Sequence, residues 1–235
     1  RTVSGNMIRP FDDLSSFVLA LEKAGQLKRI SVEVDPALEM TEIVTRVVKA
    51  GGPALLFEKV KGSPYPLAIN LFGSGRRMEM ALGRPPAEIG EELRRAAVDF
   101  FPPSLSSLWR HKGLLARAAK MAPRRVSDGP VMEVTEPPNL DELPILTCWP
   151  KDGGRFFTLP LVITQNPAGK ANVGMYRLHA FDKTTTGMHM QIERGGGAHY
   201  AEWEALGKPM PVAVALGGDP ISTLASILPL PENMD

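Results

Sequence analysis

The sequence predicts an α+β protein in which an N-terminal α/β domain is followed by a strand-rich domain. Segments with the helical period and segments with the strand period alternate over roughly residues 10–120. Beyond residue 128, the pattern changes to short apolar strands interrupted by one helix. Mostly strands with one or two helices indicate a β-barrel or sandwich rather than a doubly wound sheet. Two domains are therefore expected, at residues 1–125, which include a helical connector, and at residues 126–235.

The first predicted helix has one apolar face. Apolar side chains in residues 14–21 follow the i, i+3, i+4, i+7 spacing, with Asp12 or Asp13 as the N-cap and Gly25 as the stop. Residues 27–34 then alternate apolar and polar side chains, which predicts a half-buried strand.

A second helix is predicted from a Thr41 cap to Gly51. Two short apolar strands follow at residues 54–60 and 66–73, separated by the turn sequence KGSPYP. Together with the first helix and strand, these segments form the α/β domain.

The segment GSGRRMEMALG follows a strand and opens a helix, as phosphate-binding loops do. It contains Gly73 and Gly75 but lacks the third glycine of a dinucleotide fingerprint, so a plain tight turn is preferred. From about Pro102 the chain is basic and contains several prolines, which predicts a connector, and His111 within it receives no role.

The strand-rich domain contains several candidate elements. Its predicted strands are PVMEV at 130–134, LPLVITQNP at 159–167, ANVGMYRLHAF at 171–181, TTGMHMQIE at 185–193 and MPVAVALGG at 210–218, and its predicted helix is AHYAEWEALG at 198–207.

Composition excludes several classes of protein. Because 27 Lys and Arg face 26 Asp and Glu, the net charge of +1 gives no global field for nucleic acid. The one cysteine, Cys148, excludes an internal disulfide and a thiolate metal cluster, which fits a reducing cytoplasm, and we interpret it as a packing residue. No apolar run approaches the roughly 20 residues that span a bilayer, and the start lacks a signal-peptide core.

Polar chemistry is concentrated in residues 171–200, which contain three of the four histidines. If residues 172–180 form one strand, Asn172 and Tyr176 share a face and Arg177 lies on the other. The two faces could meet one ligand only through a bulge, which Gly174 permits. Arg177 stays protonated and is therefore suited to holding a carboxylate rather than to acting as a base.

Arg194 and Gly195 begin a second candidate site. Three consecutive glycines precede the predicted helix, so bare backbone amides beside a guanidinium could cradle a phosphate. The alternative is that the glycines only turn a strand into a helix.

His189 and Asn172 could give one nitrogen and one oxygen ligand to a divalent ion, a mixed set that suits Mn²⁺ or Mg²⁺. Two ligands are too few for a site. The alternative for His179, His189 and His199 alike is an ordinary hydrogen-bonded or surface histidine.

Four ordered motifs resemble the UbiD family of reversible decarboxylases, which includes 3-octaprenyl-4-hydroxybenzoate carboxy-lyase. They are NVGMYR, TTGMHMQIERGGGAHY, MPVAVALGGDP and LPLPENMD. The TGMH form with its glycine-rich turn is most similar to the branch assigned to menaquinone biosynthesis. The resemblance is loose over the first 120 residues and tight from about Leu159 to the end.

The resemblance implies that a central split β-barrel, similar to flavin reductases, binds prenylated FMN. Asn172 matches the family's Asn that ligates a divalent metal, usually Mn²⁺, and His189 matches a further ligand of some members; K⁺ is an additional candidate ion. Arg177 matches the Arg that orients the substrate carboxylate and is the expected catalytic residue. The implied cofactor contacts are Met175, Tyr176, Arg177, His189, Met190, Gln191, Arg194 and Gly195.

The resemblance also implies a function: non-oxidative, reversible decarboxylation of an aromatic or α,β-unsaturated carboxylic acid in ubiquinone or menaquinone biosynthesis. A flavin prenyltransferase would supply the cofactor, the full-length form would be a cytoplasmic homo-oligomer, and a prenylated substrate would bring peripheral membrane contact. The family's remaining metal-ligating Glu and its acidic proton donors would follow PENMD, so we expect the chain to be part of a longer enzyme with an incomplete barrel. Two alternatives stay open: an FMN-dependent oxidoreductase on a split barrel, and a non-catalytic flavin-binding module.

Overall fold

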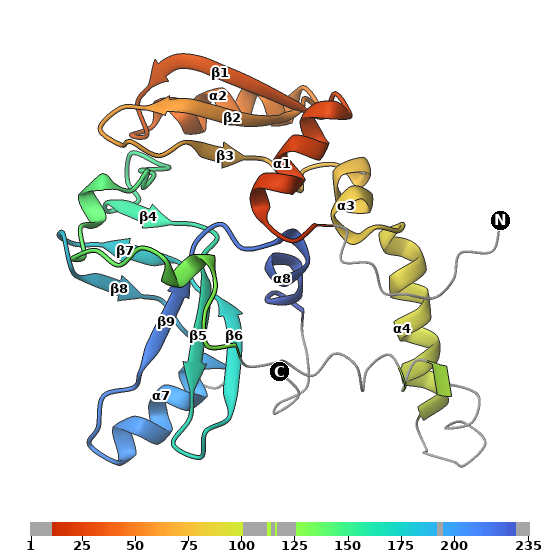
Figure 1. Cartoon of the computed structure of the whole chain (residues 1–235), viewed down its shortest axis with the longest axis vertical. Helices are drawn as coiled ribbons and strands as arrows, with labels where there is room; N and C mark the ends of the chain where they lie inside the picture. The colour runs from red at the N-terminus through yellow and green to blue at the C-terminus, as the bar shows by residue number, and fades with distance from the viewer. Residues whose placement is uncertain (1–10, 101–111, 114–115, 117–125, 192–194, 229–235) are drawn as a thin grey trace.

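The structure is a computed structural model that describes residues 11–100, 112–113, 116, 126–191 and 195–228. One three-stranded sheet with its helices forms one end of the molecule, and two further three-stranded sheets form the other (Figure 1). Most of the predicted connector and His111 lie outside the described residues, as does Arg194.

The N-terminal sheet contains β1 (Leu27–Val34), β2 (Ala54–Val60) and β3 (Leu67–Ile69) in that order. β1 and β2 are parallel and are joined by α2 (Glu39–Lys49), whereas β3 is antiparallel to β2. The first two strands have the predicted bounds. The third is shorter than predicted, because the chain turns at Asn70, whose φ is 62°.

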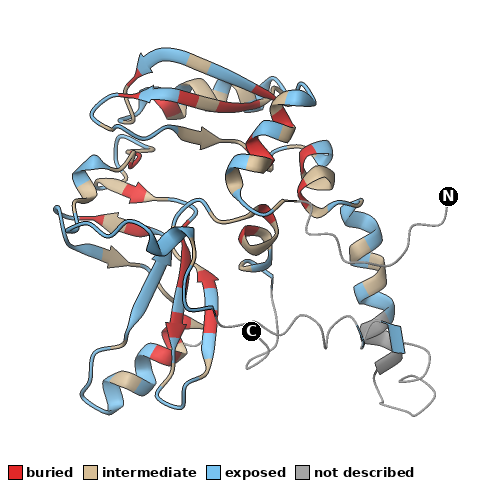
Figure 2. Ribbon diagram, viewed as in Figure 1, coloured by how far each residue is buried: buried red, intermediate tan, exposed pale blue. Residues whose placement is uncertain are grey.

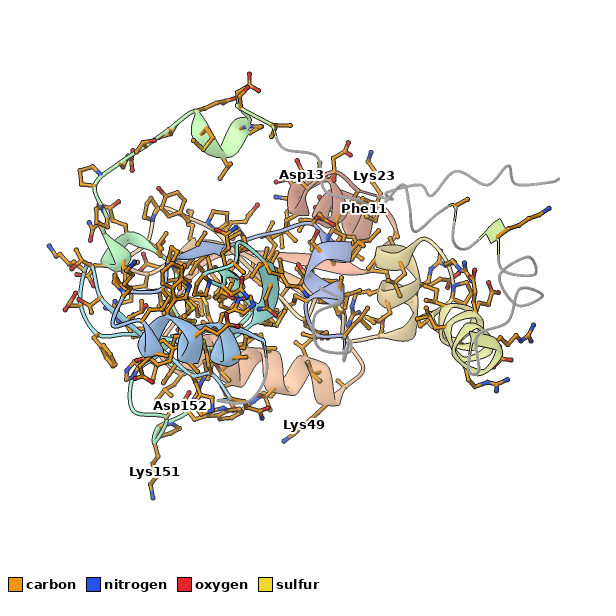
Figure 3. All side chains as sticks on the ribbon, turned by 90° about the horizontal axis from the view of Figure 1, so that it is seen from below. Phe11, Asp13, Lys23, Lys49, Lys151 and Asp152 are labelled. Carbon is orange, nitrogen blue, oxygen red and sulfur yellow. The ribbon has the colours of Figure 1, made fainter. Side chains whose placement is uncertain are left out.

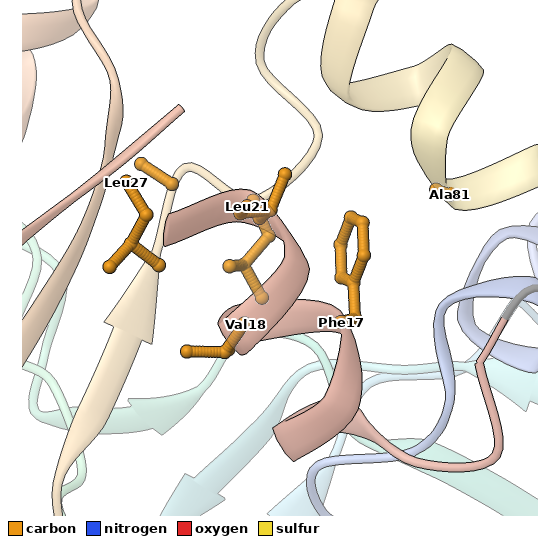
Figure 4. Close-up of a cluster of buried hydrophobic side chains, with 7 residues drawn as sticks. Phe17, Val18, Leu21, Leu27 and Ala81 are labelled. Carbon is orange, nitrogen blue, oxygen red and sulfur yellow. The ribbon is translucent and has the colours of Figure 1, made fainter. Parts of the chain in front are cut away.

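Helix α1 (Leu14–Lys23) begins with a capping box, in which the Asp13 carboxylate accepts a hydrogen bond from the Ser16 amide at 2.7 Å. Its apolar face is buried: Phe17 and Leu21 have no exposed surface. These side chains pack with others from β1 and α3 into one core cluster (Figure 4). The predicted apolar face of this helix is therefore confirmed.

Helix α2 does not begin at a Thr41 cap, so that prediction is wrong. The N-cap is Leu38, with φ at 70° and no side-chain hydrogen bond to the helix start. The Leu38 amide instead donates to the carbonyl of Thr147 at 2.9 Å. A contact with a distant segment thus fixes the start of the helix, which local sequence could not show.

Helix α3 (Gly75–Leu82) begins at Ser74, whose hydroxyl accepts a hydrogen bond from the Arg77 amide at 3.2 Å. The helix ends at Gly83 in the left-handed conformation. This ordinary cap supports the prediction of a plain tight turn. Helix α4 (Pro86–Phe100) follows it.

The C-terminal part contains two antiparallel sheets, with strand orders β4-β7-β8 and β6-β5-β9. The strands are β4 (Arg155–Phe157), β5 (Leu161–Gln165), β6 (Ala171–Met175), β7 (Leu178–Ala180), β8 (Thr186–Met188) and β9 (Val212–Ala215). Buried residues gather on β5 and β6, whereas β9 is largely exposed (Figure 2).

The structure also describes the helices α7 (Gly196–Ala205) and α8 (Pro220–Ala225) and the short 3-10 helices η1 (Pro130–Met132) and η2 (Leu140–Glu142). The strand predicted at residues 130–134 is wrong, because this segment forms η1. Val131 is 87% exposed, which shows that the apolar side chains of this segment do not pack against a sheet.

The two parts of the chain pack against each other. Leu146 belongs to the same buried cluster as Phe57 of β2, and Thr147 pairs with Ala37 as an isolated parallel bridge. The predicted domain boundary at 125/126 lies at the end of residues 117–125, which are outside the described ranges, and it stays a prediction.

The architecture is α+β, as predicted, but its sheets are small and open. Among the described residues, the strands of the C-terminal part close no barrel, so the split barrel remains an expectation. Within the same ranges, no helix is both long and apolar enough to cross a membrane.

Candidate functional site

A corner in the backbone organises the candidate site. The single strand predicted over residues 172–180 is wrong, because β6 ends at Met175 and β7 begins at Leu178 in the other sheet. The adjacent segment of the same chain, residues 157–161, turns the same corner: Leu161 pairs with Met175, and Phe157 pairs with Leu178. Tyr176 and Arg177 occupy the crossing between the two sheets.

The Tyr176 hydroxyl lies at the centre of a polar cluster. It accepts a hydrogen bond from the Gly196 amide at 2.8 Å and a longer one from Asn172 Nδ2 at 3.4 Å. Asn172 is 5% exposed, although it is an uncharged polar residue on a strand. Tyr176 therefore links β6 to the start of α7.

Gly195 must be glycine in this arrangement for two reasons. Its φ is 51°, with ψ at −123°, a conformation that residues with a Cβ rarely adopt. A Cβ atom there would lie 2.6 Å from Tyr176 Oη and 2.9 Å from Asn172 Oδ1. The glycine thus lets the backbone approach the two side chains closely.

Met190 also belongs to this cluster. Its Sδ would lie 3.2 Å from a Cβ atom on Gly196. Four predicted site residues are therefore brought together: Asn172, Tyr176, Met190 and Gly195. Met175, which precedes Tyr176 at the end of β6, is partly buried.

Gly195, the N-cap of α7, has no side chain to cap the helix, and among the described residues the Tyr176 hydroxyl is the side-chain acceptor that meets the Gly196 amide. Uncapped amides at a helix N-terminus attract anions, because the helix dipole and the free donors both favour negative charge. The side chain of His199 is directed elsewhere: its Nδ1 lies 2.9 Å from Thr164 Oγ1 in the interior. His199 therefore fixes α7 to β5, as the structural alternative for this histidine predicts.

Arg177 lies on the other side of the crossing. Its Nη1 donates to Asp152 Oδ1 at 2.7 Å, and its guanidinium carbon lies 3.9 Å from the centre of the Phe156 ring. Its carbonyl accepts a hydrogen bond from the His189 amide at 3.2 Å, so the two residues are direct neighbours across β7 and β8. Both side chains are exposed.

A row of rings continues from Arg177 along the same sheet. Phe156 stacks on His179 with ring centres 4.4 Å apart, and His179 contacts Phe181 at 4.6 Å. Two glycines leave room for these rings: a Cβ on Gly154 would lie 2.2 Å from His179 Nε2, and one on Gly187 would lie 2.6 Å from Phe181. His179 is thus a packed residue in this row.

Asp152 and Phe156 were not predicted as site residues. The local signal is weak, because the sequence KDGGRFF reads only as a glycine turn before a short aromatic strand. Their proximity to Arg177 depends on the pairing of β4 with β7, which joins residues more than twenty positions apart.

The predicted metal ligands do not form a complete site. In the ranges that the structure describes, no group of three or more His, Cys, Asp or Glu residues could hold a metal ion. Asn172 is buried in the Tyr176 cluster, and His189 is exposed beside Arg177. Gln191 is exposed as well.

Comparison with known families matches both parts of the chain. Residues 18–97 match the N-terminal domain of 3-octaprenyl-4-hydroxybenzoate carboxy-lyase, and residues 124–235 match the Rift-related domain of the same family, UbiD. The chain belongs to the UbiD family. The resemblance read from the four sequence motifs is therefore confirmed.

A UbiD relative from Chlamydia pneumoniae, named as one of the subunits of 4-hydroxybenzoate decarboxylase, is 42% identical over 212 residues, which cover 89% of this chain and 36% of the relative. Six curated relatives, this one included, are covered over only 36% to 48% of their length. The chain thus spans less than half the length of these curated relatives.

Two solved UbiD-class structures share the fold. Vanillic acid decarboxylase of Sedimentibacter hydroxybenzoicus in closed form has a TM-score of 0.79 and 27% identity, covering 95% of this chain and 46% of the other. An evolved dimeric form of the enzyme HmfF of Pelotomaculum thermopropionicum, in complex with prFMN, has a TM-score of 0.71 and 25% identity, covering 94% of this chain and 52% of the other.

Proposed function

We propose that this chain is the N-terminal portion of the working unit of a prenylated-FMN-dependent carboxy-lyase, acting on an aromatic or α,β-unsaturated carboxylic acid. The observation that carries the proposal is the convergence of Asn172, Tyr176 and Gly195 at the start of α7, with Arg177 next to Tyr176 in the chain. The family membership and the names of the relatives, which decarboxylate vanillic and 4-hydroxybenzoic acids, support it.

The residues of the Tyr176 cluster fit the anionic end of a flavin nucleotide. The backbone at Gly195 approaches without a side chain, and the start of α7 favours a phosphate. Met175, His189, Met190, Gln191 and Arg194 are the further proposed cofactor contacts. When bound, prenylated FMN supplies an electron sink for the carbanion that loss of CO₂ would leave.

Arg177 is proposed to hold the substrate carboxylate. Asp152 engages only Nη1, so the edge formed by Nε and Nη2 has no partner among the described residues. A guanidinium edge of this kind matches a carboxylate through two parallel hydrogen bonds. Arg177 would orient the acid group and would not transfer a proton.

Asn172 Oδ1 and His189 are proposed as two ligands of a divalent ion, Mn²⁺ by the family resemblance, with K⁺ as an additional candidate. An amide oxygen and an imidazole suit Mn²⁺. Two ligands do not hold an ion alone, so further ligands must come from other residues or from the cofactor phosphate.

The wider setting is proposed on the resemblance alone. A separate flavin prenyltransferase would supply the cofactor, the working form would be a cytoplasmic homo-oligomer, and the reaction would serve ubiquinone or menaquinone biosynthesis.

One observation favours a second candidate, an FMN-dependent oxidoreductase or a non-catalytic flavin-binding module. Arg177 already has a carboxylate partner in Asp152. A flavoprotein of either kind would need the phosphate cradle but no guanidinium for a substrate acid.

The deciding experiment is to express the full-length gene with a flavin prenyltransferase, identify bound flavin by mass spectrometry and measure CO₂ release from 4-hydroxybenzoate and vanillate. We expect prenylated FMN and CO₂ release, and we expect Arg177→Ala to abolish release while it retains the flavin. The control is Arg155→Ala, which removes another ion-paired arginine, 2.8 Å from Asp141, on β4. Bound unmodified FMN with nicotinamide-dependent turnover would support the second candidate instead.

A further inference from the structure

We infer that Asp152 and Phe156 are positioning residues for Arg177: they hold its guanidinium at Nη1 and on one face, and they leave the Nε–Nη2 edge presented to a substrate carboxylate. The inference rests on the proposed role of Arg177 and goes beyond it, because it names what aligns that side chain.

Asp152 is the fixed member of the ion pair. Its side chain is 12% exposed, whereas that of Arg177 is 49% exposed. Asp152 follows Lys151 in the loop that precedes β4, and the side chain of Lys151 extends outward from this loop (Figure 3). Because Oδ1 meets Nη1 alone, at 2.7 Å, the contact is end-on and does not occupy both nitrogens of the side edge.

The ring of Phe156 packs against one face of the Arg177 guanidinium. The ring is 7% exposed, and Arg177 lies 3.9 Å from its centre. His179 stacks on the same ring and is itself packed against Phe181. The antiparallel pairing of Phe156 with His179 fixes this row in the sheet.

Glycines at two positions are required for the row. The rings of His179 and Phe181 occupy the space in which a Cβ atom on Gly154 or Gly187 would lie, so a larger residue at either position would displace a ring. The stacking platform therefore depends on residues from β4, β7 and β8 together.

The contacts with Asp152 and Phe156 reduce the loss of side-chain conformational entropy when Arg177 binds an acid. An arginine on an exposed strand end samples many rotamers, and a side chain that is already ordered loses less freedom on binding. Guanidinium groups also stack favourably on aromatic faces.

Asp152 has a second, opposing effect, because its negative charge repels an incoming carboxylate. The end-on contact places that charge at the far nitrogen, away from the Nε–Nη2 edge. We therefore expect the loss of alignment to outweigh the loss of repulsion when Asp152 is neutralised.

The test measures ligand binding without turnover. The full-length gene product is loaded with FMN, and the dissociation constants of 4-hydroxybenzoate and of the neutral 4-hydroxybenzamide are measured by calorimetry. We expect Asp152→Asn and Phe156→Leu each to weaken binding of the acid about tenfold and to leave the amide within about twofold. The matched controls are Asp141→Asn, which removes the ion pair with Arg155, and Phe72→Leu, which changes an aromatic ring in the N-terminal core; both should change neither constant.

Double variants separate positioning from a merely structural role. In an Arg177→Ala background, Asp152→Asn and Phe156→Leu should weaken acid binding no further, because both act through Arg177. If Phe156→Leu fails to fold, Asp152→Asn alone carries the test.

The outcomes distinguish the positioning role of Asp152 and Phe156 from the proposed role of Arg177. Loss of acid binding in Arg177→Ala, with unchanged or tighter binding in Asp152→Asn and Phe156→Leu, would overturn the positioning role and leave the proposed function standing. Acid binding that survives Arg177→Ala would remove the proposed role of Arg177 and this inference with it.

Discussion

The Tyr176 hydroxyl accepts a hydrogen bond from the Gly196 amide at 2.8 Å, and this contact joins the end of β6 to the first turn of α7. It uses one of the amides at the helix start, which no side chain of α7 itself caps. The aromatic ring thereby sets how α7 lies on the sheet and where its remaining amides point.

We predict that Tyr176→Phe loosens this junction. The Gly196 amide and Asn172 Nδ2 would both lose an acceptor, which we expect to lower the free energy of unfolding by about 1–2 kcal/mol and to weaken flavin binding. Urea unfolding and flavin titration check the two effects. Tyr200→Phe is the control, because its hydroxyl makes only an exposed 3.3 Å contact with Glu204. Equal effects from the two variants would contradict the structural role of Tyr176.

The second prediction concerns Gly195→Ala. A Cβ atom there adds a collision with Tyr176 and Asn172 to an unfavourable backbone conformation, and strain of this kind costs about 1–3 kcal/mol. We expect lower stability together with loss of flavin binding, measured by thermal unfolding and flavin titration.

Gly207→Ala separates the two causes in this prediction. Its φ is 63°, but an added Cβ would meet nothing within 4 Å. It should lower stability through backbone strain and leave flavin binding unchanged. Retained flavin binding in Gly195→Ala would show that the close approach at Gly195 does not serve a ligand.

The sequence predicted the parts of the fold that depend on neighbouring residues. β1 and β2 have the predicted bounds, because alternating or continuous apolar runs between turn residues define a strand locally. The start of α2 was missed, since it depends on the contact between Leu38 and Thr147. The break after Met175 was missed for the same reason: it is set by the matching corner between Phe157 and Leu161.

In the candidate site as well, contacts between residues close in sequence could be predicted, whereas contacts between distant residues could not. Asn172 and Tyr176 lie four positions apart and were predicted to share a face, and Asn172 Nδ2 does lie 3.4 Å from the Tyr176 hydroxyl. Their approach to Gly195, about twenty positions further on, was not predicted, because it depends on how α7 packs on the sheet. Asp152 was missed, because only the fold brings it to Arg177 across 25 positions.

A third prediction concerns Arg77, a buried guanidinium in α3. Its side chain is 2% exposed, its Nη1 makes a 3.3 Å hydrogen bond to the Gly52 carbonyl, and its Nε finds no partner in the described part of the chain. Burial accordingly lowers the pKa of Arg77. Because a buried cation with few partners stabilises little, we expect Arg77→Met to change the free energy of unfolding by no more than about 1 kcal/mol.

Arg77→Ala provides the comparison, since it removes the aliphatic stem as well and leaves a cavity. We expect it to cost about 2–4 kcal/mol, measured by urea unfolding. A large loss in Arg77→Met would show instead that the guanidinium holds the loop at Gly52 in place.

The last prediction uses Cys148 as a reporter of the charges around Arg177. Desolvation raises the pKa of this thiol most and a hydrogen bond with Thr41 lowers it; the charge of Asp152 has a smaller raising effect and the charge of Arg177 a smaller lowering effect. The neutral thiol is therefore favoured in the folded state. This contributes stability below the pKa of the unfolded thiol, and the contribution is lost as the pH rises through the folded pKa. Alkylation by iodoacetamide, which requires the thiolate, should be slower than for a free cysteine at pH 8.

Two variants should move this rate in opposite directions. Asp152→Asn removes a charge that raises the pKa, so it should speed alkylation, whereas Arg177→Ala removes a charge that lowers the pKa, so it should slow it. The rates are measured by mass spectrometry across pH 7 to 10, with Asp141→Asn as the control, since its ion pair is with Arg155. If both variants speed alkylation, the common cause is opening of the loop around Cys148 rather than a change in charge. The ion pair between Asp152 and Arg177 would then serve to hold that loop closed.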